Sequence, residues 1–161
     1  MTPQTKATKT LSAICGLTKN ELNAIEVLGF ELYQQGRTEE ARTIFDGLIA
    51  LDERRYQGYA GKGALALAEE NLDEAASWLT QALERNSSDP AVHANLGETL
   101  LRLGRFDQAA AELGKALALD PEGKHPGANR ARAILAGMKS IMENLEKQDS
   151  QKQLSEPDSD N

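Results

Sequence analysis

The sequence predicts an all-α fold, a solenoid of tandem helix-turn-helix repeats, and three observations support that prediction. Alanine, leucine, glutamate and glutamine are frequent, and these side chains lose little conformational freedom in a helix. Aromatic residues make up only 4% of the 161 residues, whereas sheets favour aromatic and β-branched side chains. A spacing of 34 residues recurs through the middle of the chain, and such a period is typical of stacked helical repeats.

The period is visible at four positions in each of three copies. Each copy has a glycine, an alanine, a larger apolar residue and a further apolar residue: Gly29, Ala41, Phe45 and Leu48; Gly63, Ala75, Leu79 and Ala82; Gly97, Ala109, Leu113 and Ala116. The glycine and the alanine are small, so the two helices of a repeat can approach closely. The larger residue then fills the space further along the second helix. This pattern resembles the tetratricopeptide repeat, whose units stack because one unit alone cannot bury its apolar face.

Turn and cap residues place the helix ends. Gly36 and Gly104 suit a left-handed helix end because they lack a Cβ, and Glu70 replaces that glycine in the middle repeat, so a different turn is expected there. Asp89 and Pro90 predict an N-cap followed by proline in the first helical turn. The expected repeat helices are 22–35, 38–51, 56–69, 72–85, 90–103 and 106–119.

The repeats define the domain organisation. We expect a helical segment at 11–21, three repeats within 22–123 (22–55, 56–89 and 90–123), a C-terminal helix within 126–147, and disordered polar ends at 1–10 and 148–161. The C-terminal helix is predicted from apolar residues spaced by three and four positions: Ala131, Leu135, Met138, Met142 and Leu145. We expect this helix to cover the exposed end of the third repeat. The alternative is that its methionine-bearing face binds a partner.

The segment before the repeats carries a small apolar cluster. Leu11, Ile14 and Leu17 either cover the first helix pair or form a self-association surface. Thr18 and Glu21 match a capping box, which predicts the start of the first repeat helix.

Composition and charge exclude several classes of function. The net charge is -7 at pH 7, whereas nucleic-acid and anionic membrane surfaces recruit basic proteins. No apolar run reaches the roughly 20 residues of a membrane span, and the N-terminus lacks the apolar core of a secretory signal. Cys15 is the single cysteine, so no internal disulfide forms. A cytoplasmic location is therefore expected.

Residues that support catalysis or bind cofactors are sparse. The two histidines, His93 and His125, lie far apart in the sequence and with one cysteine give no zinc spacing. No glycine-rich phosphate loop is present. We expect His93 to be a packed structural histidine and His125 to be solvated. The sequence therefore predicts a non-enzymatic protein without cofactor or metal.

The first helix of each repeat should line a concave groove. Helical spacing assigns these residues to it: Asn23, Glu26, Phe30, Tyr33 and Gln34; Gln57, Ala60, Ala64, Leu67 and Ala68; Ala91, Ala94, Glu98, Leu101 and Arg102. The set is mainly apolar and small, which suits an extended peptide that offers Leu, Ile or Pro side chains. Some tetratricopeptide-repeat proteins clamp the C-terminal carboxylate of a peptide with Lys and Asn. Glu26 and Phe30 occupy two of the places where such a clamp needs those residues, so a carboxylate clamp is not expected here. The alternative for Phe30 and Tyr33 is that they pack against the N-terminal segment.

Residues 16–52, GLTKNELNAIEVLGFELYQQGRTEEARTIFDGLIALD, resemble the class II chaperones of bacterial type III secretion. The resemblance implies a small acidic cytoplasmic protein with three repeats and a terminal helix. It implies that an extended segment of a hydrophobic translocator subunit lies in the groove, with Phe30 and Tyr33 as aromatic contacts. It also implies a homodimer formed through Leu11, Ile14 and Leu17. The second and third repeats read as general repeat sequence, so the alternative function is a scaffold for assembly of a multiprotein complex.

Overall fold

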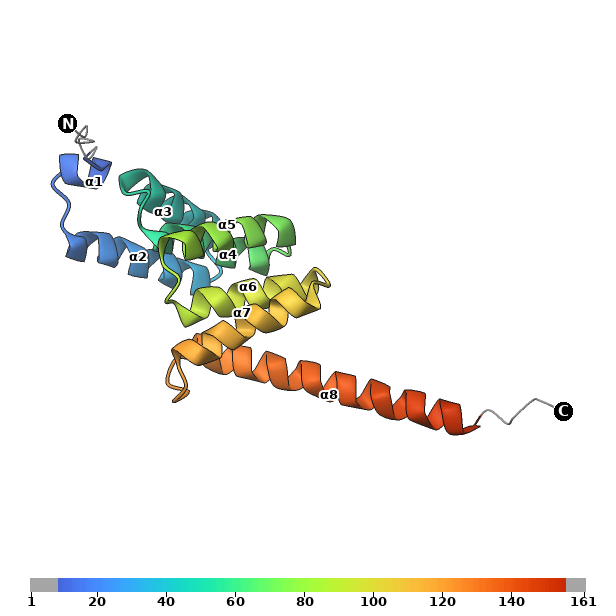
Figure 1. Ribbon diagram of the computed structural model, residues 1–161. Coiled ribbons are helices and arrows are strands. Elements are labelled where there is room, and N and C mark those ends of the chain that lie inside the picture. The colour runs from blue at the N-terminus through green and yellow to red at the C-terminus, as the bar shows by residue number, and fades with distance from the viewer. Residues whose placement is uncertain (1–8, 156–161) are drawn as a thin grey trace, which may run out of the picture.

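The chain is all-α, as predicted. The computed structural model describes residues 9–155, and over that range the elements are α1 (Leu11–Ile14), α2 (Lys19–Gln34), α3 (Thr38–Leu51), α4 (Tyr56–Ala68), α5 (Leu72–Arg85), α6 (Pro90–Arg102), α7 (Phe106–Leu119) and α8 (Pro126–Ser155). Helices α2 to α7 form three successive antiparallel pairs, and α8 follows as a long terminal helix (Figure 1). The expectations of disorder for residues 1–8 and 156–161 lie outside the described residues.

Each helix pair is held at the same close contact. A Cβ added to Gly63 would lie 2.6 Å from Leu79 Cγ, and one added to Gly97 would lie 2.6 Å from Leu113 Cγ. The equivalent contact in the first pair joins Gly29 to the ring of Phe45, at 2.8 Å. The period therefore encodes the helix-helix packing of each repeat.

The turn between α4 and α5 corrects one expectation. Glu70 has a φ of 62° and so adopts the left-handed conformation that Gly36 and Gly104 adopt at 74°. The turn in the middle repeat is thus the same as in the others, although its residue is not glycine. The same closing hydrogen bond, 2.9 Å long, joins the equivalent backbone N–H and carbonyl groups in all three turns: Arg37 to Leu32, Asn71 to Ala66 and Arg105 to Leu100. Packing of the repeat imposes this turn against the local preference of glutamate.

The described part of the N-terminal segment contains the short helix α1. Thr10, expected to be disordered, is the N-cap of α1, and α1 packs against α3. The side chains of Leu11 and Ile14 remain 47% and 68% exposed. The capping box of Thr18 and Glu21 is present, so α2 begins at Lys19, three residues before the expected start.

Helix α8 covers the end of the third repeat with its first half only. Ala131 is fully buried, and Leu135 and Met138 pack beside it against residues of α6 and α7. Met142 and Leu145 are 60% and 55% exposed, because α8 projects past the other helices (Figure 1).

The predicted end of this helix at 147 is wrong. Residues 148–155, expected to be disordered, continue α8. Glutamine, lysine and leucine in this stretch are good helix formers, and no glycine or proline interrupts it before Pro157.

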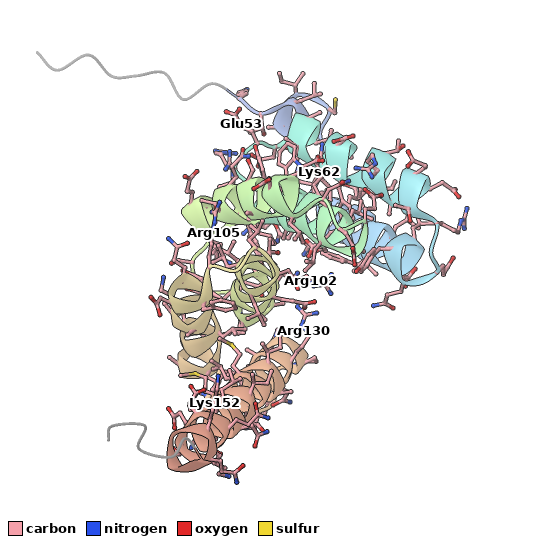
Figure 2. All side chains as sticks on the ribbon, turned by 90° about the vertical axis from the view of Figure 1, so that its right-hand side faces the viewer. Glu53, Lys62, Arg102, Arg105, Arg130 and Lys152 are labelled. Carbon is pink, nitrogen blue, oxygen red and sulfur yellow. The ribbon has the colours of Figure 1, made fainter. Side chains whose placement is uncertain are left out.

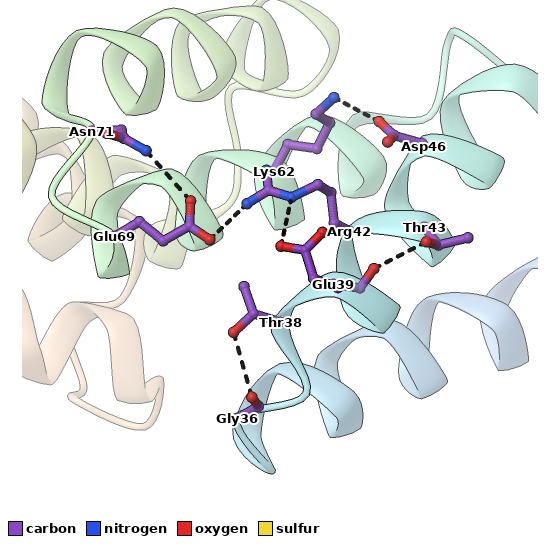
Figure 3. Close-up of polar contacts among 9 residues, drawn as sticks. All are labelled: Gly36, Thr38, Glu39, Arg42, Thr43, Asp46, Lys62, Glu69 and Asn71. Atoms are coloured by element: carbon purple, nitrogen blue, oxygen red, sulfur yellow. Dashed lines mark hydrogen bonds and ion pairs between the residues drawn. The ribbon is translucent and has the colours of Figure 1, made fainter.

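Ion pairs join the first and second repeats away from the concave side. Arg42 Nη2 lies 2.6 Å from Glu69 Oε1, and Lys62 Nζ lies 2.6 Å from Asp46 Oδ1 (Figure 3). These side chains are partly exposed, so each pair stabilises the stack by no more than about 1 kcal/mol.

Candidate functional site

The concave side of the repeats contains a groove of about 700 Å³. Its size is within the range of ligand sites, roughly 300–1,000 Å³. Its lining comes from α2, α4 and α6, the turn after α4, the loop before α8 and the start of α8: Phe30, Tyr33, Gln34, Ala64, Leu67, Ala68, Glu70, Ala91, Asn95, Glu98, Arg102, His125, Pro126, Gly127 and Arg130.

The structure brings part of the predicted groove set together. The predicted residues that line the groove are Phe30, Tyr33, Gln34, Ala64, Leu67, Ala68, Ala91, Glu98 and Arg102. The predicted residues that do not line it are Asn23, Glu26, Gln57, Ala60, Ala94 and Leu101. That the lining residues bind a peptide remains a prediction.

Ala94 is the clearest correction among these residues. It is fully buried and packs with Leu113, Ala116 and Ala131. Because α8 packs against α6, this face of α6 lies inside the core and not on the groove. Ala60 is also buried, at 7% exposure, in the core of the second repeat.

The end of the groove next to the first repeat is apolar. Phe30 packs edge-on against the ring of Phe45, with the ring centroids 5.0 Å apart. Phe30 and Tyr33 both pack on the buried cluster of the first repeat, which includes Leu48 and Leu65. Among the described residues, the N-terminal helix α1 contacts α3 instead of α2, so it does not provide the alternative packing for these two aromatic residues. Their half-buried side chains leave surface facing the groove.

The opposite end of the groove is charged. Glu98 Oε1 accepts a hydrogen bond from Arg102 Nη2 at 2.8 Å, and Glu98 Oε2 lies 3.7 Å from Arg130 Nε. Arg130 also donates a hydrogen bond to Asn95 Oδ1, and Arg102 lies 3.7 Å from a carboxylate oxygen of Glu70. Figure 2 shows Arg102 and Arg130 side by side, in the space between the repeats and α8.

Asn23 and Glu26, predicted for the groove, hold α2 to the segment before α4. Arg55 Nη2 donates to Asn23 Oδ1 at 2.7 Å and to Glu26 Oε2 at 3.3 Å. Burial raises the pKa of Glu26, and the charge of Arg55 opposes this rise. Nearby, Tyr56 donates to Asp89 Oδ2 at 2.9 Å. Burial and then the negative charge of Asp89 raise the pKa of Tyr56 to about 12.

The two histidines have different environments. His93 is 4% exposed, with Nδ1 2.7 Å from Glu112 Oε2 and Nε2 3.0 Å from the Ser87 carbonyl oxygen, and is structural as predicted. His125 was expected to be solvated but is half-buried and lines the groove. The loop folds back because Asp120 accepts a hydrogen bond from the His125 backbone N–H at 2.7 Å.

The part of the chain that the structure describes offers no metal site and no membrane-spanning helix. Between residues 9 and 155 no group of three His, Cys, Asp or Glu side chains is placed to hold a metal ion. None of the helices in that range combines the length and apolar character needed to cross a membrane. Cys15 is an exposed free thiol.

The groove-lining residues that the sequence analysis did not assign to it are Glu70, Asn95, His125, Pro126, Gly127 and Arg130. The start of α8 reaches the groove because Gly127 packs directly on α6, where an added Cβ would lie 2.5 Å from Ala91 Cα. The glycines on both sides of His125 were the available signal for a close backbone approach.

Comparison with known proteins supports the repeat assignment along most of the chain. Two tetratricopeptide-repeat family models match, one over residues 28–90 and the other over residues 66–136. Together they cover residues 28–136, from within α2 to the first turns of α8. Both are models of the tetratricopeptide repeat, so the chain is built from tetratricopeptide repeats.

Solved structures of type III secretion proteins share this fold. A type III secretion complex from Aeromonas hydrophila is 25% identical, with a TM-score of 0.69 over 84% of this chain and 91% of that one. PcrH in complex with the chaperone-binding region of PopD is 27% identical, with a TM-score of 0.67 over 79% of this chain and 97% of that one. The translocator chaperone SycD of Yersinia enterocolitica has a TM-score of 0.68 at 23% identity, covering 81% and 99% of the two chains. The resemblance to the translocator chaperones is thus confirmed.

A curated relative matches about half of this chain. U-box domain-containing protein 70 from rice, Oryza sativa subsp. japonica, is 29% identical over 90 residues, which are 56% of this chain. The match spans 11% of the length of that protein.

Proposed function

We propose that this protein is a bacterial cytoplasmic chaperone that binds an extended segment of a hydrophobic type III secretion translocator in its concave groove. It acts by binding and not by catalysis, and it needs no cofactor. The observation that carries the proposal is the groove of about 700 Å³ in a chain similar to PcrH. PcrH has been solved with the chaperone-binding regions of PopB and PopD, at 28% and 27% identity to this chain.

The groove suits an apolar extended segment. Phe30 and Tyr33, both half-buried, offer apolar surface at one end, where the buried Ala64 and Leu67 form part of the wall and the small Ala68 leaves room beside them. Burial of a client's apolar side chains removes them from water, which stabilises the complex by roughly 25 cal/mol per Å². A client that is bound in this way exposes less surface for aggregation.

The proposal includes a homodimer formed through the N-terminal segment. Leu11 and Ile14 expose apolar surface on α1, while Leu17 is half-buried. A second crystal structure of SycD contains an alternative dimer. Analytical ultracentrifugation tests this part: Ile14→Asp should convert dimer to monomer, and a wild-type chain that is monomeric at high micromolar concentration contradicts it.

The binding test uses synthetic peptides of the chaperone-binding regions of PopB and PopD, titrated into the protein by calorimetry. The double variant Phe30→Ala with Tyr33→Ala should weaken binding about tenfold or more, because two apolar contacts are lost. The matched control is Val27→Ala with Leu28→Ala, on exposed positions of the same helix, and it should bind like the wild type. Circular dichroism checks that both variants remain helical.

Two results would overturn the proposed function. One is that neither peptide binds the wild-type protein. The other is that the groove variant and the control variant bind equally. If the protein instead binds folded subunits of a larger complex and neither peptide, the scaffold alternative is favoured.

A further inference from the structure

We propose that the groove selects a bound segment that carries an acidic side chain, which binds between Arg102 and Arg130. This inference rests on the proposed function and adds a specificity rule to it. The apolar end of the groove explains why a segment binds. The paired arginines at the other end distinguish one apolar segment from another.

The two arginines reach the groove from different elements. Arg102 is the last residue of α6, and Arg130 lies in the second turn of α8. Their side chains are 42% and 47% exposed, so an incoming group can contact both. Figure 2 shows them together, whereas Arg105 lies on another side of the molecule.

The charges at this end favour an additional anion. The two guanidinium groups share the carboxylate of Glu98, whose side chain is 21% exposed. The second acidic neighbour of Arg102 is Glu70, at 3.7 Å, but its side chain is 82% exposed and therefore strongly screened by water. One sheltered carboxylate thus faces two cations.

The chemistry of the guanidinium group suits a carboxylate ligand. Arginine presents its N–H donors in a planar fork that matches the two oxygens of a carboxylate. One nitrogen of Arg102 donates a hydrogen bond to Glu98, and one nitrogen of Arg130 donates a hydrogen bond to Asn95. Donors on both groups therefore remain for an aspartate or glutamate of the bound segment.

The fold also sets the spacing of that acidic residue. Helix α2 contacts α4, and α4 contacts α6, so Phe30 and Arg102 are separated by two helix-to-helix steps. Neighbouring helix axes lie about 8–10 Å apart, which gives about 16–20 Å. An extended segment advances about 3.3 Å per residue. The acidic residue should therefore lie about five or six residues from the side chain that contacts Phe30 and Tyr33.

Long-range attraction does not produce this preference. The chain has a net charge of -7, and at long range this net charge repels an acidic segment. The preference must come from the local contacts of the two arginines. A variant that removes a positive charge elsewhere should leave it unchanged.

The experiment scans one aspartate through the non-anchor positions of the PopD peptide, with asparagine at the same position as the reference. Calorimetry with the wild-type protein should show one position, about five or six residues from the apolar anchor, where aspartate binds at least about fivefold tighter than asparagine. Arg102→Gln with Arg130→Gln should abolish this preference while asparagine peptides still bind. Arg105→Gln is the matched control and should retain it.

Each outcome separates the two proposals. Equal binding of aspartate and asparagine peptides at every position overturns the acidic selection and leaves the chaperone function standing. So does a preference that survives in the double variant. Failure of all peptides to bind the wild-type protein overturns both. If the glutamine variants unfold, Arg102→Lys with Arg130→Lys keeps the charges but loses the planar fork, and a preference that is not reduced there contradicts bidentate binding.

Discussion

The glycine at the contact of each helix pair gives the most direct test of the fold. In the third repeat, a Cβ added at Gly97 would lie 2.6 Å from Leu113 Cγ, 2.8 Å from Cδ2 and 3.2 Å from the backbone nitrogen. Leu113 is fully buried, and it packs with Ala94 and Ala116, so it has no free space to enter. Gly97→Ala should therefore force the two helices apart at a cost of about 2–3 kcal/mol, in the upper part of the range for overpacking.

The helical preference of alanine offsets part of that cost. Alanine is favoured over glycine in a helix by about 1 kcal/mol, so the net loss for Gly97→Ala is about 1–2 kcal/mol. Gly114 is the matched control, because it lies in α7 and its added Cβ would meet nothing within 4 Å. Gly114→Ala should gain up to about 1 kcal/mol, and the two variants should therefore differ by about 2–3 kcal/mol.

Urea unfolding followed by circular dichroism measures this difference. The midpoint should fall for Gly97→Ala and rise for Gly114→Ala, with an unchanged slope. If Gly97→Ala is as stable as Gly114→Ala, the helices of the pair do not approach as described, and the explanation of the 34-residue period is refuted.

Three further predictions test the turn, the core and the pH response. Glu70→Gly should stabilise the protein by about 0.5–1 kcal/mol, because it removes a left-handed residue with a Cβ. Gly104→Ala should destabilise it for the opposite reason. If both variants change the thermal unfolding midpoint by the same amount in the same direction, this explanation of the turn is contradicted. Ala94→Leu should cost about 1–3 kcal/mol by overpacking, and an unchanged stability in urea would place Ala94 on the groove after all. Burial and then the charge of Asp89 raise the pKa of Tyr56 from 10.0 to about 12. The protonated Tyr56 therefore contributes fully to the free energy of unfolding below pH 10, and this contribution is lost as the pH rises toward 12. Tyr56→Phe should therefore flatten the fall in unfolding free energy over that interval, and an equally steep fall in the variant would show that other groups cause it.

Features that depend on neighbouring residues in the sequence were predictable. The bounds of α3, α5 and α7 agree with the predicted ranges, because each helix follows a turn and begins at a defined step of the period. Asp89 caps α6 with its side chain, as the sequence indicated. The close approach of the two helices at each glycine followed from the period, whereas the contact of that glycine with the large residue of the second helix is shown by the structure.

Features that depend on packing between distant segments were not predictable. Ala94 has the helical position of a groove residue, but α8 covers it. The sequence predicted that the terminal helix covers the end of the third repeat, but not which residues of α6 it buries. The turn at Glu70 follows the packing of its repeat and not the preference of its residue type. Helical spacing found the apolar end of the groove because Phe30 and Tyr33 belong to a repeat helix, whereas Arg130 belongs to a helix outside the repeats.

Gly127 connects the capping helix to the chemistry of the groove. Its added Cβ would lie 2.5 Å from Ala91 Cα and 2.8 Å from Ala91 N, and backbone atoms cannot turn aside as a side chain can. The missing side chain therefore allows α8 to begin directly against α6. From that position Arg130 reaches Asn95 and Glu98. The helix that covers the end of the last repeat thus also supplies a wall and a positive charge to the groove, so that stability and selectivity depend on the same contact.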